Sequence, residues 1–440
     1  MTTTESKSEF ANYQTAFDEF NANQPGPEWL TNLRRSGISH FTELGFPTLK
    51  QEEWIFTNVR PISELPFRPA TKASNTSIEL DSFTFAGLTG SRLIFIDGIF
   101  SASHSTIEKL PDGVIVASLA DAIEHHGTLV EKHLARHLRT DASGFSALNA
   151  AFVQDGAFIH LPQDKVVEEP IHLLFVSTDG DANIATVRNL IVAEPNARAK
   201  LIESYYSAGT SAHFTNAVTE IVVNEGAHIE HCKFQEQNQE SFHVASIQAQ
   251  LEKASHFTSH SISTGARIAR NDINILMNGE GIDCVLNGLY VVGGKQLVDH
   301  HTLADHAMPN CGSHEFYHGI LGGQSRGVFN GKIFVREDAQ KTNAKQTSRV
   351  ILMSDKATVN AKPQLEIFAD DVKCTHGATV GQLNDEAVFY CRSRGIDEAS
   401  ARRLLTHAFA SEVINRISIE PVRDHLESLL WNRLEELIED

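Results

Sequence analysis

Cysteine is scarce in this sequence. Its 440 residues contain only Cys232, Cys284, Cys311, Cys374 and Cys391, and no two of them form a Cys-x-x-Cys pair. Scattered cysteines in a chain of this length indicate reduced thiols inside a cell rather than a disulfide framework. The length is also sufficient to bury a large core and favours two or three domains.

Positive charge is also in short supply. The chain has 37 Lys and Arg against 56 Asp and Glu, which gives a formal net charge of −19. Binding to nucleic acid or to an anionic membrane surface depends on basic residues, so this composition argues against both. No apolar run is long enough to cross a bilayer. We therefore expect a cytoplasmic protein.

Motifs for phosphate and acyl chemistry are missing as well. The nearest approach to a P-loop, residues 327–333, has one residue too few between its glycines, and Ile333 stands where Ser or Thr should hold magnesium. There is no dinucleotide-binding glycine fingerprint and no Gly-x-Ser-x-Gly elbow. We expect the chain to be non-catalytic on its own.

What the sequence does contain is a recurring unit between about residues 156 and 390. A short strand-like segment ends in a polar turn, and another strand-like segment follows. The turns lie at 194–197, 224–227, 252–254, 279–282, 336–339 and 354–357, and the first four are about 27 to 30 residues apart. Because hardly any helical window separates these units, they favour a parallel β-helix. An antiparallel β-sandwich is the alternative from the pattern alone.

Helical periodicity flanks this region on both sides. Before it, Tyr13, Phe17 and Phe20 recur at helical spacing, and residues 118–138 form a second helical stretch with Ser118 as N-cap. His133 and His137 are four apart in that stretch, where a surface position is favoured over a metal site. We predict a helical or mixed domain over 1–155, a β-helix over 156–395 and a helical segment over 396–440.

The helical segment at the C-terminus contains two amphipathic stretches, which begin near Asp397 and Pro421. Their apolar stripes include Leu404, Phe409, Ile414, Leu426, Leu430 and Leu434. Two such helices could cap the open end of a solenoid or bind a partner, and the pattern alone favours the cap.

A dense group of potential metal ligands lies between residues 300 and 318. It contains His300, His301, Asp305, His306, Cys311, His314 and His318. Imidazole, thiolate and carboxylate together can bind zinc or iron(II), with His301 and His306 as candidate ligands. Pro309 and Gly312 indicate a loop here, and no spacing matches a known metal motif. Structural histidines that hydrogen-bond to the backbone are the favoured alternative.

The chemistry is most concentrated in residues 364–381. This segment opens as a strand, in which Leu365 and Ile367 alternate with polar residues. Cys374 and His376 follow, and on a strand this spacing of two places both side chains on the same face. A thiolate and an imidazole on one face form half of a site for iron, zinc or copper, so further ligands must come from elsewhere.

Residues 364–381, continued through 389–396, resemble the signature of the SufB/SufD family of iron–sulfur cluster assembly scaffold proteins. The resemblance extends through 342–346, the histidines around His300 and residues 50–54, and it covers most of the chain. It favours the SufD branch, because the segment from Cys374 differs from its SufB counterpart. Ser348 also aligns with a SufB cysteine, which argues against independent sulfur acceptance by this chain.

The resemblance implies a right-handed parallel β-helix that works in a complex with a SufB-type subunit and SufC, an ABC-type ATPase. In the family the C-terminal helices bind SufC, so the stripes from Leu404 to Leu434 become candidate partner-binding residues. His376, assisted by Cys374, would help to build a transient iron–sulfur cluster at the SufB interface, with His376 as a candidate iron ligand. A reduced flavin is associated with such complexes, but this sequence has no flavin motif.

Three alternatives stay open at this point. The chain could form a homodimer when SufB is absent. It could be a metal-dependent carbohydrate-active β-helix enzyme, although Asp370 and Asp371 are adjacent on a strand and would face opposite ways. It could also be a purely structural, self-associating solenoid.

Overall fold

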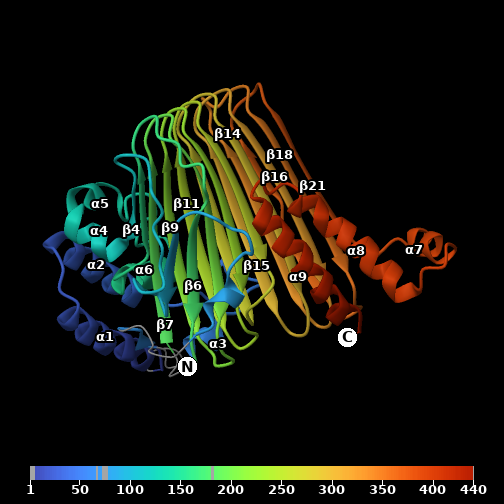
Figure 1. Cartoon of the computed structure of the whole chain (residues 1–440), viewed down its shortest axis with the longest axis horizontal. Helices are drawn as coiled ribbons and strands as arrows, with labels where there is room; N and C mark the ends of the chain where they lie inside the picture. The colour runs from blue at the N-terminus through green and yellow to red at the C-terminus, as the bar shows by residue number, and fades with distance from the viewer. Residues whose placement is uncertain (1–4, 66–67, 72–77, 180–182, 440) are drawn as a thin grey trace.

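Two parallel sheets face each other and form a flattened solenoid, seen in a computed structural model that describes residues 5–65, 68–71, 78–179 and 183–439 (Figure 1). Sheet A contains, in spatial order, β19 (Thr358–Ala361), β17 (Arg326–Val335), β15 (Leu297–His306), β13 (Ile268–Met277), β11 (Phe242–Leu251), β9 (Phe214–Val223), β7 (Asn183–Ala193), β5 (Ala157–Leu161) and β4 (Ile115–Ser118), with β1 (Arg68–Pro69) on β7 and β20 (Gln364–Ile367) on β17. Sheet B contains β21 (Lys373–Gly381), β18 (Asn343–Leu352), β16 (Gly312–Leu321), β14 (Asp283–Val292), β12 (His256–Ser263), β10 (His228–Glu236), β8 (Arg198–Ser207), β6 (Ile171–Ser177), β2 (Arg92–Ile96) and β3 (Ile99–Phe100).

The chain alternates between the two sheets, so each pair of successive strands makes one coil. From β5 to β21 the described neighbours within each sheet pair in parallel, as in the register Glu230↔Thr258 of β10 and β12. The predicted parallel β-helix is confirmed, and the antiparallel sandwich is wrong. Antiparallel pairing among the described strands occurs only at the first coil, between β2 and β3 and between β4 and β5.

The turns at one edge of the solenoid form a ladder of their own. The tip residue of each adopts a left-handed backbone conformation, for example Asn196 at φ 62° and Gly226 at φ 67°. The backbone N–H of Asn196 donates to the carbonyl of Glu225 in the next turn, and Gly226 donates to Lys253. Asn and Gly tolerate this conformation, which explains why polar turn residues recur at this spacing.

Five of the six predicted turns lie at this edge, and the sixth, 354–357, lies at the opposite edge between β18 and β19. The turn between β15 and β16, residues 307–311, was missed. Its tip residue Asn310 has φ 61°, and its N–H donates to the carbonyl of Gln340 in the following turn. This turn begins Ala-Met-Pro, so its sequence does not match the polar pattern of the others.

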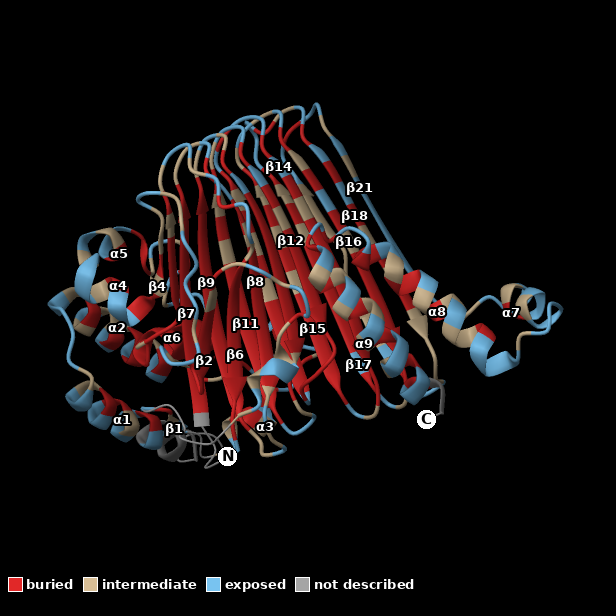
Figure 2. Ribbon diagram, viewed as in Figure 1, coloured by how far each residue is buried: buried red, intermediate tan, exposed pale blue. Residues whose placement is uncertain are grey.

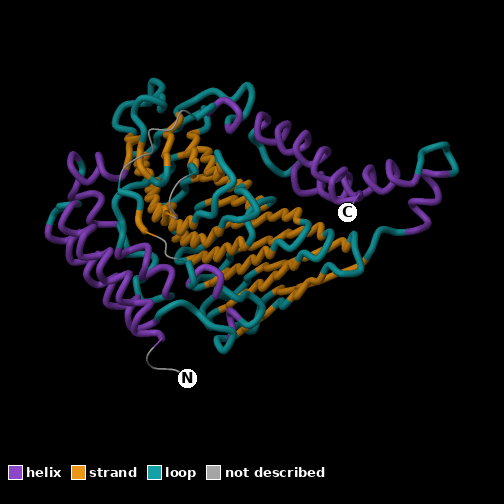
Figure 3. Tube along the Cα trace, turned by 90° about the horizontal axis from the view of Figure 1, so that it is seen from below, coloured by secondary structure: helices purple, strands orange, loops and turns teal. Residues whose placement is uncertain are grey.

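The N-terminal helices cover the outer face of sheet A (Figure 3). They are α1 (Glu5–Asn23), α2 (Glu28–Leu44), α4 (Leu119–His125), α5 (Gly127–His133) and α6 (Gly144–Ala151), and the short α3 (Arg60–Ser63) lies between α2 and α4 in the chain. The single helix predicted over 118–138 is instead the pair α4 and α5, because the backbone of His126 leaves helical geometry between them. The Ser118 side chain does cap α4, accepting the N–H of Asp121 at 3.1 Å.

The C-terminal helices α8 (Glu398–Ile414) and α9 (Glu420–Glu439) lie on the outer face of sheet B. They pack on outward residues such as Ile202, Phe234 and Ile320. They therefore cover the side of the solenoid and not its open end, so the predicted end cap is wrong. The two apolar stripes face a sheet because each strand of sheet B presents apolar side chains outward as well as inward.

The sheets also cross the predicted domain boundary at 155/156. Strands β2 and β4, which precede it, belong to sheets B and A. At the other boundary, α7 (Asp385–Arg392) lies before residue 396 and projects away from the solenoid (Figures 1 and 2). None of the described helices is both long and apolar enough to span a bilayer.

Candidate functional site

The solenoid ends at an exposed strand. Among the described residues, β21 pairs only with β18, so one edge of its backbone has no strand beside it. Most of its side chains are exposed, in contrast to the buried strands of the interior (Figure 2). An unpaired edge of nine residues is a template for adding a further strand, because its N–H and C=O groups are free to pair.

Cys374 and His376 lie on this end strand. Their register partners on β18 are Ala344 and Gln346, which are buried between the two sheets. Cys374 and His376 therefore share the inward-facing positions of the last coil, as their spacing predicted. His376 is exposed because no described coil stacks beyond it, whereas Cys374 is half-buried beside Ala344 and Val335. Burial raises the pKa of the Cys374 thiol, so in the chain alone it stays protonated and is a weak nucleophile.

Asp371, just before β21, shapes the turn. The Asp371 carbonyl accepts the N–H of Lys341, and the Asp371 carboxylate pairs with the Lys341 ammonium group. Gln340 accepts the N–H of Asp371 through its side chain at 2.9 Å. These contacts hold the last turn of the ladder in place and so fix where β21 begins.

The histidines between 300 and 318 do not converge on one point. The segment is not the predicted loop, because it forms β15, a turn and β16, and alternation along the strands sends the side chains to different faces. His300 and His306 are buried, and burial lowers their pKa values to about 3 and about 4. His306 Nε2 lies 2.8 Å from the hydroxyl of Ser313, and His314 is exposed.

His301 lies between two carboxylates on the outer face of sheet A. Its Nδ1 is 3.1 Å from Glu53 Oε2 and its Nε2 is 3.0 Å from Asp299 Oδ1. Burial disfavours a charge here, but the two carboxylates outweigh it and raise the pKa of His301 to about 9. A protonated ring with both nitrogens engaged has no lone pair for a metal. In this state His301 has no lone pair to offer to a metal, whereas a role of His306 as a metal ligand stays a prediction.

The segment around Glu53, part of the region matched from sequence, is held by the same cluster. The Arg270 guanidinium lies 3.7 Å from the ring centre of Trp54 and donates to the carbonyl of Glu53 and to Asp299. His301 thus helps to fasten residues 50–54 onto sheet A. The only signal in the sequence was the resemblance of residues 50–54 to the family, which gives no partner for Glu53.

His133 and His137 are neighbours, with ring centres 6.0 Å apart, although His137 lies beyond the end of α5. The predicted surface position is wrong for His133, which is buried, and burial lowers its pKa to about 4. In the parts of the chain that the structure describes, no three His, Cys, Asp or Glu side chains are arranged to hold a metal ion.

The six candidate partner-binding residues divide into two kinds. Leu404 has 43% of its surface exposed. The others are buried against sheet B or between the two helices: Phe409, Ile414, Leu426, Leu430 and Leu434. Phe409 also stacks on His318 at 4.0 Å between ring centres, and its carbonyl accepts from His318 Nδ1 at 2.8 Å. These five side chains are used within the chain, and their role in partner binding stays a prediction.

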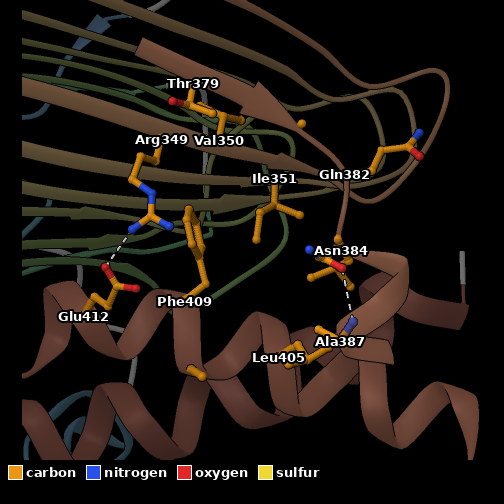
Figure 4. Close-up of a pocket in the computed structure, with 13 residues that line it drawn as sticks. Arg349, Val350, Ile351, Thr379, Gln382, Asn384, Ala387, Leu405, Phe409 and Glu412 are labelled. Atoms are coloured by element: carbon orange, nitrogen blue, oxygen red, sulfur yellow. Dashed lines mark hydrogen bonds and ion pairs between the residues drawn. The ribbon is translucent and has the colours of Figure 1, made fainter. Parts of the chain in front are cut away.

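A groove of about 360 Å³ separates the end of the solenoid from α7 and α8 (Figure 4). Val350 and Thr379 line it from β18 and β21, and Leu405 lines it from α8. Arg349 crosses the groove to pair with Glu412 at 2.8 Å. The groove therefore lies between the end strand and the C-terminal helices.

The fold and its end strand place the chain in the class of parallel β-solenoid proteins. The family model for the SufBD core domain of the SUF iron–sulfur cluster assembly system matches residues 175–409, and the model for the SufBD N-terminal region matches residues 7–173. Together these two matches cover most of the chain, which belongs to the SufBD family of iron–sulfur cluster assembly proteins.

Similar proteins come from bacteria and from a chloroplast. A SufBD family protein of Synechocystis is 32% identical over 90% of this chain and 89% of its own length. The iron–sulfur cluster assembly protein SufD of Escherichia coli is 31% identical over 90% of this chain and 91% of its own length. The chloroplastic protein ABCI7 of Arabidopsis thaliana is 29% identical over 91% of this chain and 86% of its own length.

Proposed function

We propose that this chain is a SufD-type scaffold subunit, which assembles iron–sulfur clusters together with a SufB-type subunit and the ATPase SufC. The observation that carries this proposal is the exposed end strand β21, which presents His376 and Cys374 beside an unpaired backbone edge. A second subunit that adds a strand there would bring its own ligands next to these two. Two half-sites joined in this way supply the ligands that one Cys and one His lack.

Iron and sulfide are the cargo of this site. His376 offers an imidazole to the iron. Cys374 assists as a thiolate when contact with the second subunit lowers the pKa of its thiol. The SufB-type subunit supplies the sulfur-accepting cysteine and SufC the ATP-driven conformational work. A reduced flavin belongs to this proposal only as a component of the whole complex. A second copy of this chain is the alternative occupant of the edge when no SufB-type subunit is present.

The apolar residues around the end strand support such an interface. Ile367, Phe368 and Val380 are 38%, 60% and 45% exposed, and all lie on the last coil or directly after it. Apolar side chains gathered on an unpaired edge are typical of a surface that a partner covers.

Replacement of His376 by Ala tests the proposal. We expect the assembled complex to lose cluster maturation, while the isolated chain keeps its stability to within about 0.5 kcal/mol, because an exposed side chain contributes little to folding. Iron and sulfide content after anaerobic reconstitution is the measurement. His314→Ala, which removes an exposed histidine from a strand of the same sheet, is the matched control. Normal maturation with His376→Ala would contradict the assigned role.

We place the SufC contact on the exposed part of the C-terminal helices. Phe389 and Tyr390 on α7 are 71% and 58% exposed, and Leu404 on α8 is 43% exposed. Burying one Phe or Leu contributes about 1.5–3 kcal/mol, which corresponds to about tenfold or more in affinity. These three side chains are therefore sufficient for a specific contact, without disturbing the buried stripes.

The double variant Phe389→Ser, Leu404→Ser should lose SufC in a pull-down and keep its SufB-type partner. Leu49→Ser, at a side chain 50% exposed near the N-terminal helices, is the control. Removal of α9 is a poorer test, because it would uncover the apolar face of sheet B and unfold the region. SufC retained at parental affinity by the double variant would exclude this docking surface.

A further inference from the structure

The end strand is the last layer of a column of polar side chains inside the solenoid. Glu315 of β16 is in register with Gln346 of β18, and Gln346 is in register with His376 of β21. Residues in register on neighbouring parallel strands are about 4.8 Å apart and project in the same direction. Gln346 therefore lies directly behind His376, and Glu315 lies one strand further in. The family resemblance of residues 342–346 gave Gln346 no role.

Glu315 orients the side-chain amide of Gln346. Gln346 donates from Nε2 to Glu315 Oε2 at 3.1 Å, and the Thr302 hydroxyl donates to the same oxygen at 2.7 Å. Glu315 and Gln346 are 2% and 1% exposed. Because an ionised carboxylate accepts and does not donate, Glu315 in its ionised form selects the nitrogen end of the Gln346 amide.

The oxygen end of Gln346 is left without a partner. Gln346 Oε1 is buried and makes no hydrogen bond to any described residue. A buried acceptor that stays unpaired costs about 1–3 kcal/mol, so such an atom calls for an explanation. The nitrogen end of the amide also packs closely against Gly331, since a Cβ atom there would lie 2.1 Å from Gln346 Nε2.

We propose that Gln346 is a positioning residue for His376. The exposed ring of His376 turns inward, donates one N–H to Gln346 Oε1, which has no partner in the described arrangement, and leaves its other nitrogen free for iron. A neutral imidazole carries one N–H and one lone pair, so fixing the N–H fixes the tautomer and the direction of the lone pair. Metal-binding histidines in proteins commonly donate their second N–H to an oxygen in this way. The role of Gln346 in iron binding rests on the proposed function, but its contact with His376 can be tested in the chain alone.

The tautomer of His376 in the full-length, metal-free chain is the first measurement. Nitrogen-15 spectra of histidine-labelled protein above about pH 8, where an ordinary imidazole is neutral, distinguish the two tautomers. The His376 signal is identified by its loss in His376→Ala. We expect one dominant tautomer in the parent and a mixture of both in Gln346→Leu.

Two further variants sharpen the result. Ser348, on the same strand as Gln346, has a buried hydroxyl without a described partner, and Ser348→Ala removes it. Ser348 is in register with Ala378 and not with His376, so the His376 signal should not change. Glu315→Gln keeps the shape of the core and removes the carboxylate that orients Gln346, so it should also give a mixture. It serves in place of Gln346→Leu should that variant fail to fold.

The assembled complex supplies the second measurement. We expect Gln346→Leu to lower iron incorporation about 10- to 100-fold, the range typical for residues that orient a metal ligand, and Ser348→Ala to leave it unchanged. An unchanged His376 spectrum in both Gln346→Leu and Glu315→Gln would overturn the positioning role, whatever the complex does. Normal maturation with His376→Ala would instead overturn the proposed function. If the tautomer of His376 still changed in Gln346→Leu, the contact between Gln346 and His376 would nevertheless be supported.

Discussion

The charged state of His301 is expected to stabilise the protein in a way that depends on pH. His301 lies between Asp299 and Glu53 with only 12% of its side chain exposed, and its pKa is raised from 6.5 to about 9. A group with a raised pKa in the folded state adds stability that is fully present below its unfolded pKa. This stability is then lost as the pH rises from about 6.5 through about 9.

The size of the effect follows from the pKa difference. One unit of difference in pKa between the folded and unfolded states corresponds to 1.36 kcal/mol. A rise in the pKa of His301 from 6.5 to about 9 therefore contributes at most about 3 kcal/mol to the free energy of unfolding. Asp299 keeps Arg270 and Thr57 as partners when His301 is removed, which limits the damage to that carboxylate. We therefore expect His301→Gln to destabilise the chain by about 1–3 kcal/mol at pH 6.

Urea unfolding of the parent and of His301→Gln at pH 6, 7.5 and 9.5 measures this directly. The difference between the two should be largest at pH 6 and close to zero at pH 9.5. His314→Gln, an exposed histidine on β16, is the matched control and should behave as the parent at every pH. A difference that stays constant between pH 6 and 9.5 would refute the reasoning, because it would mean that His301 acts through packing and not through its charge.

The remaining predictions concern the buried core and the isolated chain. Burial raises the pKa of Glu315 from 4.5 to about 7, so Glu315→Gln should stabilise the chain at pH 8.5, where the acid would otherwise ionise, and have little such effect at pH 4; thermal unfolding at both pH values checks this. Arg188→Met should destabilise by about 3–5 kcal/mol in urea, because it strands the Glu220 carboxylate, paired at 2.6 Å with both side chains buried. The isolated chain should hydrolyse no ATP and retain no stable cluster, and stoichiometric iron and sulfide bound after anaerobic purification would contradict this.

Several parts of the fold could be predicted because their signals are local. The turns at 194–197 and 224–227 were recognised as short polar segments between strand-like segments, and their left-handed tips are Asn196 and Gly226, which tolerate that conformation. Ser118 was recognised as a helix cap and Asp397 as the start of a helix, and both side chains accept a backbone N–H there. The turn at 307–311 was missed because its tip, Asn310, follows Met308 and Pro309 instead of the acidic residues of the other turns.

The histidines around position 300 show where local reasoning stops. Seven potential ligands within nineteen residues left a metal site open beside the favoured structural histidines, and the strands of the solenoid send His300 inward and His301 outward. The partners that decide the chemistry of His301 are Asp299, two positions away, and Glu53, which is 248 residues away. No spacing rule within the segment contains that second contact.

The sequence by itself determined the coil length, the turn chemistry and the pairing of Cys374 with His376 on one face, since each depends on residues a few positions apart. The tertiary structure alone decided that β21 is the exposed last strand, that Gln346 and Glu315 lie behind His376, and that α8 and α9 cover a sheet instead of an open end. The physical reason is that stacking in a β-solenoid brings together residues about 30 positions apart along the chain, and helix packing joins surfaces farther apart still. Periodicity reports that a face will be buried, but only the register between coils specifies which side chain it meets.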